Sequence, residues 1–311
     1  MQESIPYLLL YKIAQLFLVM MIGFALVKFR VVKPKHSVAL SRLALYLLMP
    51  SSILNAFNVE MTSEIMVGLG LAFAVGLVLH LLFLGLDQIF AKVGHGTAVE
   101  RASIMYSNSI NIIIPIVGFV LGDEWIIYSL GYMSVQLFFT WSHGVGLFDH
   151  SKGINLKKIF LNPNIIAILV GLYLVTMRVR LPEFVTDITS SFGGVLGYIG
   201  MLIAGMRAAG LDFKSMAKYP RLYITTAMRV IACPILSLAV LLLIRLIVKI
   251  PNTTEILLVS FLATMTPSAA TVMQLAQIHD TEIEYSVAIN IMTTLAACIT
   301  MPLLVVLYQA I

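Results

Sequence analysis

Charged residues are scarce in this chain of 311 residues, at 11% of the total, whereas a soluble domain carries about 25%. Hydrophobic residues make up 60%, and the mean hydropathy is +0.98. A soluble protein of this composition would expose large apolar patches and aggregate. In a bilayer the same surface faces hydrocarbon, so the composition indicates an integral membrane protein.

Cysteine is also rare, and neither Cys233 nor Cys298 lies in a CxxC pair or near a histidine. This spacing excludes a disulfide framework and a cysteine-based metal site, so we interpret both as small packing residues. The chain lacks a phosphate-binding loop, HExxH, GxSxG and a plausible dinucleotide fingerprint. Paired intramembrane acids and a nucleophile with its base are missing too. We therefore predict no enzyme, no metal and no cofactor.

The net charge of +5 is modest, and no basic patch alternates with aromatic residues, so we predict no nucleic-acid partner. The basic residues are instead distributed unevenly among the connections between the predicted helices. Fourteen fall at 28–42, 92–101, 152–158 and 207–221, and four fall at 178–180 and 245–249. The positive-inside rule makes the first set cytoplasmic. We predict a multi-pass protein of the cell (plasma or inner) membrane with both termini outside, although the cytoplasmic loop 279–284 then lacks basic residues.

Spanning the hydrocarbon core takes about 20 apolar residues. Ten segments meet or nearly meet this length, and the N-terminal segment is interpreted as a retained helix because it has no basic start and no cleavage site. The predicted spans are 5–28, 37–58, 65–90, 101–121, 125–148, 159–177, 184–206, 219–248, 255–278 and 284–309. The predicted fold class is an all-α polytopic membrane protein with ten transmembrane helices.

The chain repeats itself weakly at a shift of 157 residues. DEWIIYS at 123–129 falls on DTEIEYS at 280–286, and Ser103 falls on Ser260. An odd number of helices in each half turns the second copy upside down in the membrane. We therefore predict two inverted five-helix repeats, residues 1–150 and 151–311, an arrangement typical of secondary transporters.

The predicted fourth and ninth helices are the most polar, and each contains proline. Proline removes a backbone donor, and broken helix survives in a bilayer only where it lines a cavity or packs on protein. The residues concerned are Ser107, Asn108, Asn111 and Pro115 in the fourth helix and Thr266, Pro267 and Ser268 in the ninth.

Thr266 followed by Pro267 combines a good N-cap with a proline suited to the first helical position. It predicts that a half-helix starts in mid-membrane, and Asn108 or Asn111 would cap a second one in the fourth helix. Two half-helix N-termini suit an anion such as a carboxylate, and half-helix C-terminal carbonyls suit a cation. The alternative is a pair of proline-kinked helices whose polar groups bond neighbouring helices.

Ionisable and amide residues inside a membrane span are costly to bury, so we treat each of them as a candidate functional residue. His80 and Asp87 are seven residues apart, hence on one helix face, and could relay a coupling proton; a neutral, hydrogen-bonded His80 is the alternative. Gln136 and Asn290 could line the same cavity and help hold a coupling ion, H⁺ or Na⁺, or they could lock helices together. Arg229 has no partner that the sequence identifies.

Several segments resemble the auxin efflux carrier family, which includes bacterial malate and malonate permeases and plant PIN-type auxin carriers. The resemblance runs over nearly the whole chain. It is carried by GFALVKFRVVKPKHSVALSRLALYLLMPSSIL at 23–54, the SN..N...P pattern from 107 to 115, NPNIIAILVGL at 162–172, MLIAGMRAAGLDF at 201–213, RVIACP at 229–234, TPSAA at 266–270 and ITMP at 299–302.

This resemblance implies a ten-helix fold related to the bile-acid symporters. Helices 1, 2, 6 and 7 would form a scaffold that supports a homodimer, and helices 3–5 and 8–10 a transport domain containing crossed helices 4 and 9. It also implies crossover and substrate-site positions at Asn108, Asn111, Pro115 and Pro267. The family often has glycines where this chain has Ile110 and Ile113, so we expect tighter backbone approach or a more apolar pocket.

We therefore predict a secondary transporter, a permease for a small organic anion such as a mono- or dicarboxylate. It would work by alternating access, with a mid-membrane site at the helix 4/9 crossover. A carrier-like membrane receptor, which would normally append a signalling domain, and a channel are the alternatives; the direction of transport stays open. The predicted substrate-binding residues are Ser107, Asn108, Asn111, Thr266 and Ser268.

Overall fold

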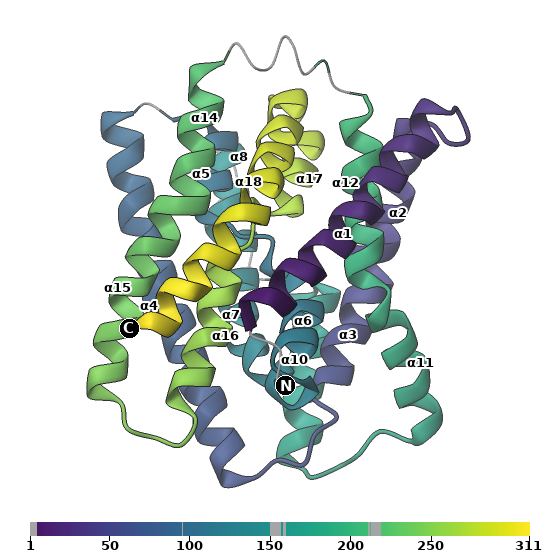
Figure 1. The fold of residues 1–311 in the computed structure, drawn as a ribbon. Helices are drawn as coiled ribbons and strands as arrows, with labels where there is room; N and C mark the ends of the chain where they lie inside the picture. The colour runs from purple at the N-terminus through teal and green to yellow at the C-terminus, as the bar shows by residue number, and fades with distance from the viewer. Residues whose placement is uncertain (1–4, 95, 150–156, 158–159, 211, 213–218) are drawn as a thin grey trace.

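The computed structural model describes residues 5–94, 96–149, 157, 160–210, 212 and 219–311, and Figure 1 shows this part of the chain as a bundle of helices. The first half contains α1 (Ile5–Lys28), η1 (Pro34–His36), α2 (Ser37–Leu43), η2 (Ala44–Leu48), α3 (Met49–Ala56), α4 (Ser63–Val93), α5 (Ala98–Met105), α6 (Ser109–Val120), η3 (Asp123–Trp125), α7 (Ile126–Phe139), η4 (Thr140–Gly144) and α8 (Val145–Phe148). The second half contains α10 (Pro163–Thr176), α11 (Glu183–Gly194), α12 (Leu196–Ala208), α14 (Pro220–Ala227), η5 (Met228–Ala232), α15 (Cys233–Ile247), α16 (Thr253–Met265), α17 (Ala270–Ile278) and α18 (Ile283–Ala310).

Helices long and apolar enough to cross a membrane account for five of the predicted spans, the second, third, seventh, eighth and tenth. They are Pro34–Ala56, Ser63–Val93, Glu183–Ala208, Pro220–Ile247 and Ile283–Ala310. Shorter apolar helices lie in the first, fourth, sixth and ninth, at Ala14–Lys28, Ser109–Val120, Pro163–Thr176 and Thr253–Met265. The predicted fifth span is helical through α7, η4 and α8 but falls in neither set. These findings confirm an all-helical, polytopic membrane protein.

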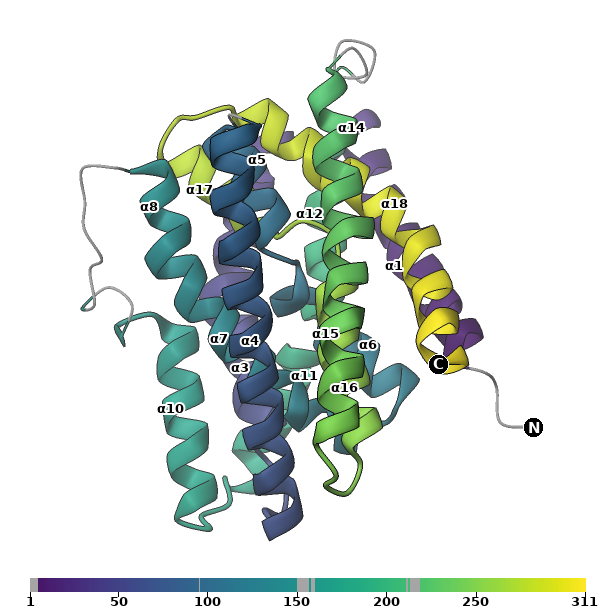
Figure 2. The same ribbon diagram turned by 90° about the vertical axis from the view of Figure 1, so that its left-hand side faces the viewer.

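Two groups of helices lie side by side in Figure 1. On the right, α1 packs along α12, and α3 packs against α11 and against α10, which lies in the lower middle of the view. On the left, α4 packs along α7, α15 along α16, and α14 against α18. Turned by 90°, the molecule presents α4 and α15 to the viewer, with α10 to one side (Figure 2). The helices α6 and α17 lie between the two groups.

Close helix contacts depend on small residues. A methyl group at Gly205 of α12 would lie 1.8 Å from the carbonyl oxygen of Met20 in α1, and one at Gly23 would lie 2.3 Å from the carbonyl oxygen of Leu202. In α7, a methyl group at Gly131 would lie 2.6 Å from the backbone nitrogen of Phe73 in α4. Small residues that let helix backbones approach are the usual basis of packing in lipid, where apolar surface alone gives no preference for protein.

Three of the helical spans contain a π-helical stretch, at η2, η4 and η5. Two of them lie just before a proline, since Pro50 follows η2 and Pro234 follows η5. A proline lacks the N–H that a regular turn would use, and a widened turn accommodates the missing bond. The span containing each proline therefore continues as a helix.

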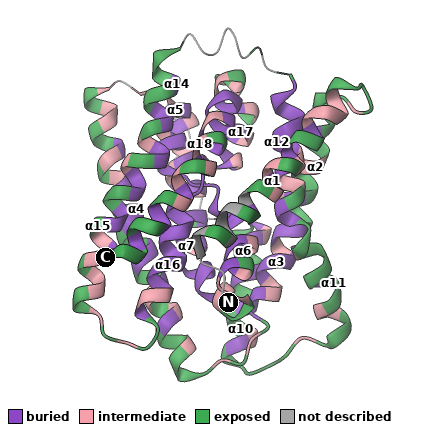
Figure 3. Ribbon diagram, viewed as in Figure 1, coloured by how far each residue is buried: buried purple, intermediate pink, exposed green. Residues whose placement is uncertain are grey.

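Burial follows the position of each helix in the bundle. Figure 3 shows exposed residues on the outward faces of the peripheral helices and buried residues towards the middle. Exposed large apolar side chains include Leu18, Leu81, Leu246 and Leu303. Such an apolar outer surface fits contact with lipid.

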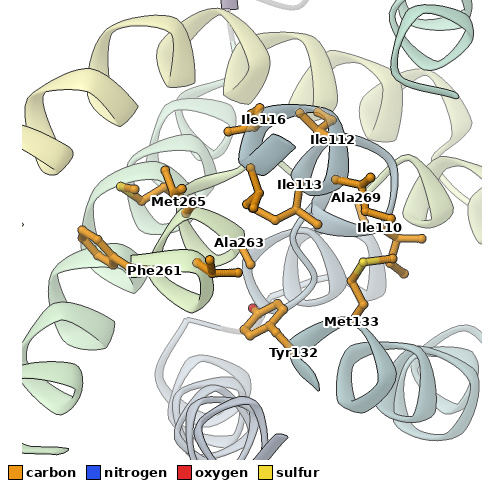
Figure 4. Close-up of a cluster of buried hydrophobic side chains, with 14 of the residues drawn as sticks. Ile110, Ile112, Ile113, Ile116, Tyr132, Met133, Phe261, Ala263, Met265 and Ala269 are labelled. Carbon is orange, nitrogen blue, oxygen red and sulfur yellow. The ribbon is translucent and has the colours of Figure 1, made fainter. Parts of the chain in front are cut away.

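A buried apolar core fills the middle of the bundle around the two broken helices. Figure 4 shows Ile113 of α6, Ala263 of α16 and Tyr132 of α7 near the centre of this core, and Phe261 on the other side of α16. Ile110, like Ile113, belongs to this core, and neither lines the cavity described below. The side chains that stand at these two positions therefore fill the core, and their effect on backbone approach or on the pocket stays an expectation.

Candidate functional site

Both of the most polar predicted spans are broken in the middle. In the first half of the chain α5 ends at Met105 and α6 begins at Ser109. In the second half α16 ends at Met265 and α17 begins at Ala270. The residues between the half-helices have extended or irregular backbone, so each break leaves peptide groups without helical partners.

The two breaks satisfy these peptide groups by pairing with each other. Ser107 and Ser268 form an isolated antiparallel bridge. The N–H of Asn108 donates to the carbonyl of Pro267 at 2.7 Å, and the N–H of Ala269 donates to the carbonyl of Tyr106 at 2.9 Å. Backbone groups in a bilayer need such partners because no water can replace them. We call this pairing of residues 106–108 with 266–269 the crossover.

Gln136 of α7 holds the first strand of the crossover. Its Nε2 donates to the Ser107 carbonyl at 2.6 Å, and its Oε1 accepts from the Ser107 hydroxyl at 2.6 Å. Both side chains are fully buried. One amide thus uses both of its polar ends on a single residue, which fixes the orientation of the strand.

Asn290 and Thr293 of α18 hold the second strand. The Asn290 Nδ2 donates to the Ser268 carbonyl at 2.6 Å, and the Ser268 N–H donates to the Thr293 hydroxyl at 3.1 Å. The predicted alternative that Gln136 and Asn290 lock helices together therefore matches their hydrogen bonds. Asn290 also lines the cavity described below.

Asn108 connects the two half-helices that leave the crossover. It is the N-cap residue of α6, but its side chain makes no cap bond to that helix. Its Oδ1 instead accepts from the N–H of Ala270, at the start of α17, at 3.3 Å and from Asn111 Nδ2 at 2.8 Å. A residue of one half of the chain thus caps a half-helix of the other half, which sequence spacing alone does not predict.

Arg229 occupies the opposite, C-terminal side of the half-helices. It is fully buried, and its guanidinium donates to the Ile104 carbonyl at 2.9 Å, to the Thr266 carbonyl at 3.2 Å and to the Thr264 carbonyl. These carbonyls lie at the ends of α5 and α16, where no further turn of helix can pair them. The sequence did not identify a partner for Arg229. The structure shows that its guanidinium, itself a cation, binds the half-helix C-terminal carbonyls that were predicted to suit a cation.

A narrow cavity adjoins the crossover, with a free volume of about 30 Å³ and with apolar residues such as Met201, Ile203 and Met273 in its lining beside polar ones. This volume holds a water molecule or two and no larger ligand. Its lining includes three amides that the sequence singled out, Asn108, Asn111 and Asn290, and two polar residues from the opposite group of helices, Ser41 and Arg207. Thr271, Gln274 and Thr294 add further polar groups.

Three of the five predicted substrate-binding residues lie outside this lining. Ser107, Thr266 and Ser268 are buried in the crossover and use their backbone groups to maintain it. Thr266 ends α16 as its C-cap, and its hydroxyl donates back to the Ala263 carbonyl. The prediction that Thr266 is the N-cap of the second half-helix is wrong, because α17 begins only at Ala270.

The two prolines predicted as crossover or hinge positions lie in different parts of the structure. Pro267 lies in the crossover, where its carbonyl accepts from Asn108. Pro115 lies inside α6, well beyond the break, and packs against Gly197 of α12. The prediction that Pro115 marks the crossover is therefore wrong, since the break precedes it by two helical turns.

The predicted pair of His80 and Asp87 is not in contact. His80 is fully buried, its Nδ1 lies 2.7 Å from the Gly76 carbonyl, and its Nε2 has no partner among the described residues. Seven residues separate the two by about 10 Å along a helix, so sharing a face does not bring them together. No direct hydrogen bond therefore joins His80 to Asp87, the hydrogen bond of His80 matches the stated alternative, and a coupling role for either residue stays a prediction.

Asp87 belongs to a different network. Arg101 binds it through two hydrogen bonds of 2.8 and 2.6 Å, and His143 Nε2 lies 3.3 Å from its Oδ2. His143 Nδ1 in turn lies 2.9 Å from the hydroxyl of Tyr106, whose carbonyl is part of the crossover. The network therefore joins an ion pair to the crossover through one histidine and one tyrosine.

A second ion pair lies at the start of α5, just outside the predicted fourth span. Glu100 accepts from Arg221 at 2.7 and 2.6 Å and from Tyr285 at 3.0 Å, and it completes a capping box with Thr97. Burial acts to raise the pKa of the Glu100 carboxyl, but its hydrogen bonds and the nearby Arg221 charge outweigh burial and lower that pKa below its ordinary value. Glu100 is therefore a charged anchor between α5 and α14.

Arg207 is the cavity residue that the sequence reading missed. It was counted among the basic residues of a cytoplasmic connection, because it lies near Lys214, Lys218 and Arg221; of these, Lys214 and Lys218 lie outside the described residues. The structure buries Arg207 in the last turn of α12. The sequence did contain a signal, the apolar segment of α12 that ends at Arg207. A charged side chain at the end of such a segment can point into the protein as well as towards water.

The fold and this site together indicate the class of protein. A polytopic helical protein in which two broken helices cross beside a cavity lined by several amides has the arrangement of a membrane transporter. A family model described as membrane transport protein matches residues 8–155 and 148–305. The chain therefore belongs to this membrane transport family, and the predicted membership of the auxin efflux carrier family is confirmed. No curated protein matches the chain.

Proposed function

We propose that this protein is a secondary transporter for a small organic anion, and that the anion binds at the crossover. The observation that carries the proposal is the set of amides from both halves of the chain, Asn108, Asn111 and Asn290, around one buried cavity. Amide N–H groups and the N-termini of α6 and α17 favour a carboxylate.

The chemistry of the cavity favours an anion over a cation. The carbonyls at the half-helix C-termini, which could attract a cation, already accept from Arg229. On the cavity side, Asn108 Oδ1 is used by Asn111 and Ala270, which leaves the Asn108 Nδ2 donor for a ligand. A free amide donor in such a cavity suits a carboxylate.

Alternating access supplies the movement that the narrow cavity requires. Ligand pockets for small molecules usually have volumes of at least about 300 Å³, ten times that of this cavity. The helices that line it come from two groups, α2 and α12 on one side and α6, α17 and α18 on the other. We propose that the first group, with α1, α3, α10 and α11, is the predicted scaffold, and that the second moves against it as the transport domain.

The proposed architecture is two inverted five-helix repeats. At a shift of 157 residues, α4 corresponds to α14–α15, α5 to α16 and α7 to α18. Gln136, which holds Ser107, corresponds at this shift to Thr293, which holds Ser268. A repeated way of holding each strand supports a common origin for the two halves.

The orientation and the homodimer are also part of the proposal. The ends of α1, α4 and α12 and the start of α14 lie at the upper end of the molecule in Figure 1, and in the sequence most basic residues lie close to these helix ends. Single cysteines in a cysteine-free background test the orientation. An impermeant maleimide should label Glu60→Cys from outside intact cells but not Lys92→Cys; the reverse pattern would contradict both termini being outside. Molecular mass in detergent by light scattering tests the dimer.

Counterflow in proteoliposomes tests the function. Vesicles preloaded with one carboxylate should show saturable uptake of the same labelled carboxylate, across a panel of mono- and dicarboxylates. Linear uptake without counterflow would indicate a channel. Binding of carboxylates without any transport would indicate a carrier-like receptor. Repeating the assay under imposed H⁺ and Na⁺ gradients identifies a coupling ion, and the absence of carboxylate transport and binding would overturn the proposal.

A further inference from the structure

Arg207 is a buried cation that no acid neutralises. Its side chain is almost wholly inaccessible, and among the described residues no carboxylate forms an ion pair with it. This differs from Arg101 and Arg221, which each bind a carboxylate through two hydrogen bonds. Burying an unpaired charge is costly, so a buried cation usually has a counterion in some state of the protein.

Two serines of α2 orient the Arg207 guanidinium. The Arg207 Nε donates to the Ser37 hydroxyl at 3.4 Å, and its Nη2 donates to the Ser41 hydroxyl at 3.1 Å. The Ser41 hydroxyl itself donates to the Ser37 carbonyl at 2.8 Å, which fixes its oxygen lone pairs towards Arg207. Neutral hydroxyls position the guanidinium without cancelling its charge, and three of its five N–H groups are left for another acceptor.

The position of Arg207 relative to the amides gives it a role in selectivity. Arg207 and Ser41 line the same cavity as Asn108, Asn111 and Asn290 but come from the opposite group of helices. A small anion held only by the amides would touch one group. An anion with a second negative group could reach both, because the cavity connects them.

We propose that Arg207, held by Ser37 and Ser41, binds a second anionic group of the substrate, so that the transporter selects small dianions over monoanions of the same length. This inference rests on the proposed function. The guanidinium forms charge-assisted hydrogen bonds with the second carboxylate, and a monocarboxylate of equal length leaves the same cation unpaired. Roughly tenfold to hundredfold discrimination follows from one such contact.

A purely structural role for Arg207 makes a different prediction. Arg207 lies in the last turn of α12, where a positive charge interacts favourably with the helix C-terminus. Loss of that interaction would weaken the binding of every substrate to a similar degree. Selectivity between two substrates therefore separates the two roles.

Succinate and butyrate, four-carbon acids with two and one carboxylates, are the test pair. Counterflow and binding are measured at pH 7.5, where succinate is a dianion, for the wild type and for Arg207→Gln. The wild type should prefer succinate by about tenfold or more. Arg207→Gln should abolish the preference, because it weakens the binding of succinate and leaves the binding of butyrate nearly unchanged. Arg207→Lys should restore part of the preference.

Ser41→Asp tests the same point while retaining Arg207. The Ser41 hydroxyl is 3.1 Å from Arg207, so an aspartate there supplies an internal counterion and should remove the succinate preference without unfolding the protein. Ser41→Asn is its neutral control, and Arg180→Gln, which changes an exposed residue outside the cavity lining, should behave as wild type.

Three results would overturn the inference. The first is a succinate preference that survives in folded Arg207→Gln or Ser41→Asp. The second is an equal loss of binding and counterflow for both acids in these variants, and the third is a wild-type protein that exchanges both acids without preference. In each case the wild-type protein still transports an anion, so the proposed function stands. If the wild type transports and binds no carboxylate, the proposed function fails instead and the inference fails with it.

Discussion

The backbone N–H of Asn108 donates to the carbonyl of Pro267 at 2.7 Å, and this bond joins two segments from different halves of the chain. The Asn108 side chain reinforces the junction through its Oδ1, which accepts from Asn111 and from the N–H of Ala270. Asn108 thus has two separable functions. Its oxygen maintains the crossover, and its Nδ2 is available to the cavity.

Substitutions at Asn108 should separate these two functions. An aspartate keeps the acceptor oxygen but replaces the Nδ2 donor by a negative oxygen. At about 4 Å and an effective dielectric near 20, repulsion of a bound carboxylate is on the order of 4 kcal/mol, or roughly a thousandfold in affinity. Asn108→Ala loses both contacts of the oxygen and should cost about 1–3 kcal/mol of stability. Binding measured by calorimetry and thermal unfolding in detergent would reveal the contrast.

The expected order is that Asn108→Asp binds the anion worst and that Asn108→Ala unfolds at the lowest temperature. Both variants need normal expression for the comparison. If Asn108→Asp binds a carboxylate as well as the wild type, the anion does not contact Asn108.

Gln136 should be a stability residue. Gln136→Ala removes both bonds to Ser107 and leaves the buried Ser107 carbonyl without its donor, at a cost of about 2–4 kcal/mol. Gln136→Glu keeps the acceptor for the Ser107 hydroxyl but, when ionised, directs a second oxygen at the Ser107 carbonyl, so it should be destabilising as well. Thermal unfolding of purified protein measures both effects, with Gln274→Ala, a cavity-lining glutamine, as the matched control. Unaltered unfolding temperatures in both Gln136 variants would contradict the assignment.

The stability contributed by Glu100 should depend on pH in a defined direction. Its pKa in the folded protein lies below the ordinary value of 4.5, so the contribution is fully present above about 4.5 and is lost as the pH falls through the lower folded pKa. The difference in unfolding temperature between wild type and Glu100→Gln should be constant from pH 7 to 5 and shrink below 4.5. Glu60→Gln, which alters an exposed pair with Arg180, should show almost no difference at any pH. A difference that grows as the pH falls would contradict this sign.

Local sequence signals predicted much of this fold. The long apolar runs identified the spans, and the clusters of polar residues with proline identified the two that break. Charge spacing could not predict which ion pairs form, since Asp87 binds Arg101 and His143 from other helices and makes no contact with His80. The choice of partners depends on how α4, α5 and η4 pack against one another, and the spacing of residues within α4 carries no information about that packing.

Capping signals were ambiguous for a related reason. Thr266 before Pro267 is compatible with the start of a helix, but also with the extended end of one, because proline fits extended backbone as well as a first helical turn. The structure uses the second option, with Thr266 ending α16. The cap that α17 does receive comes from Asn108 in the other half of the chain, a tertiary contact that no local pattern reveals.

Arg229 gives the last prediction. Its guanidinium donates to carbonyls at the ends of α5 and α16, so its charge is shared between the two half-helices. Arg229→Met removes all these donors, which leaves the Thr264 and Thr266 carbonyls unpaired and the Ile104 carbonyl with only the weak Cys233 thiol donor. This should cost at least about 3 kcal/mol and lower the yield of folded protein. Arg229→Lys keeps the charge but has a compact ammonium in place of a planar fork, so it should retain only part of the stability. Arg245→Met, in the last turn of α15, is the matched control and should unfold near the wild-type temperature. Stability is measured by thermal unfolding in detergent, and an Arg229→Met protein as stable as the wild type would show that the carbonyls find other partners.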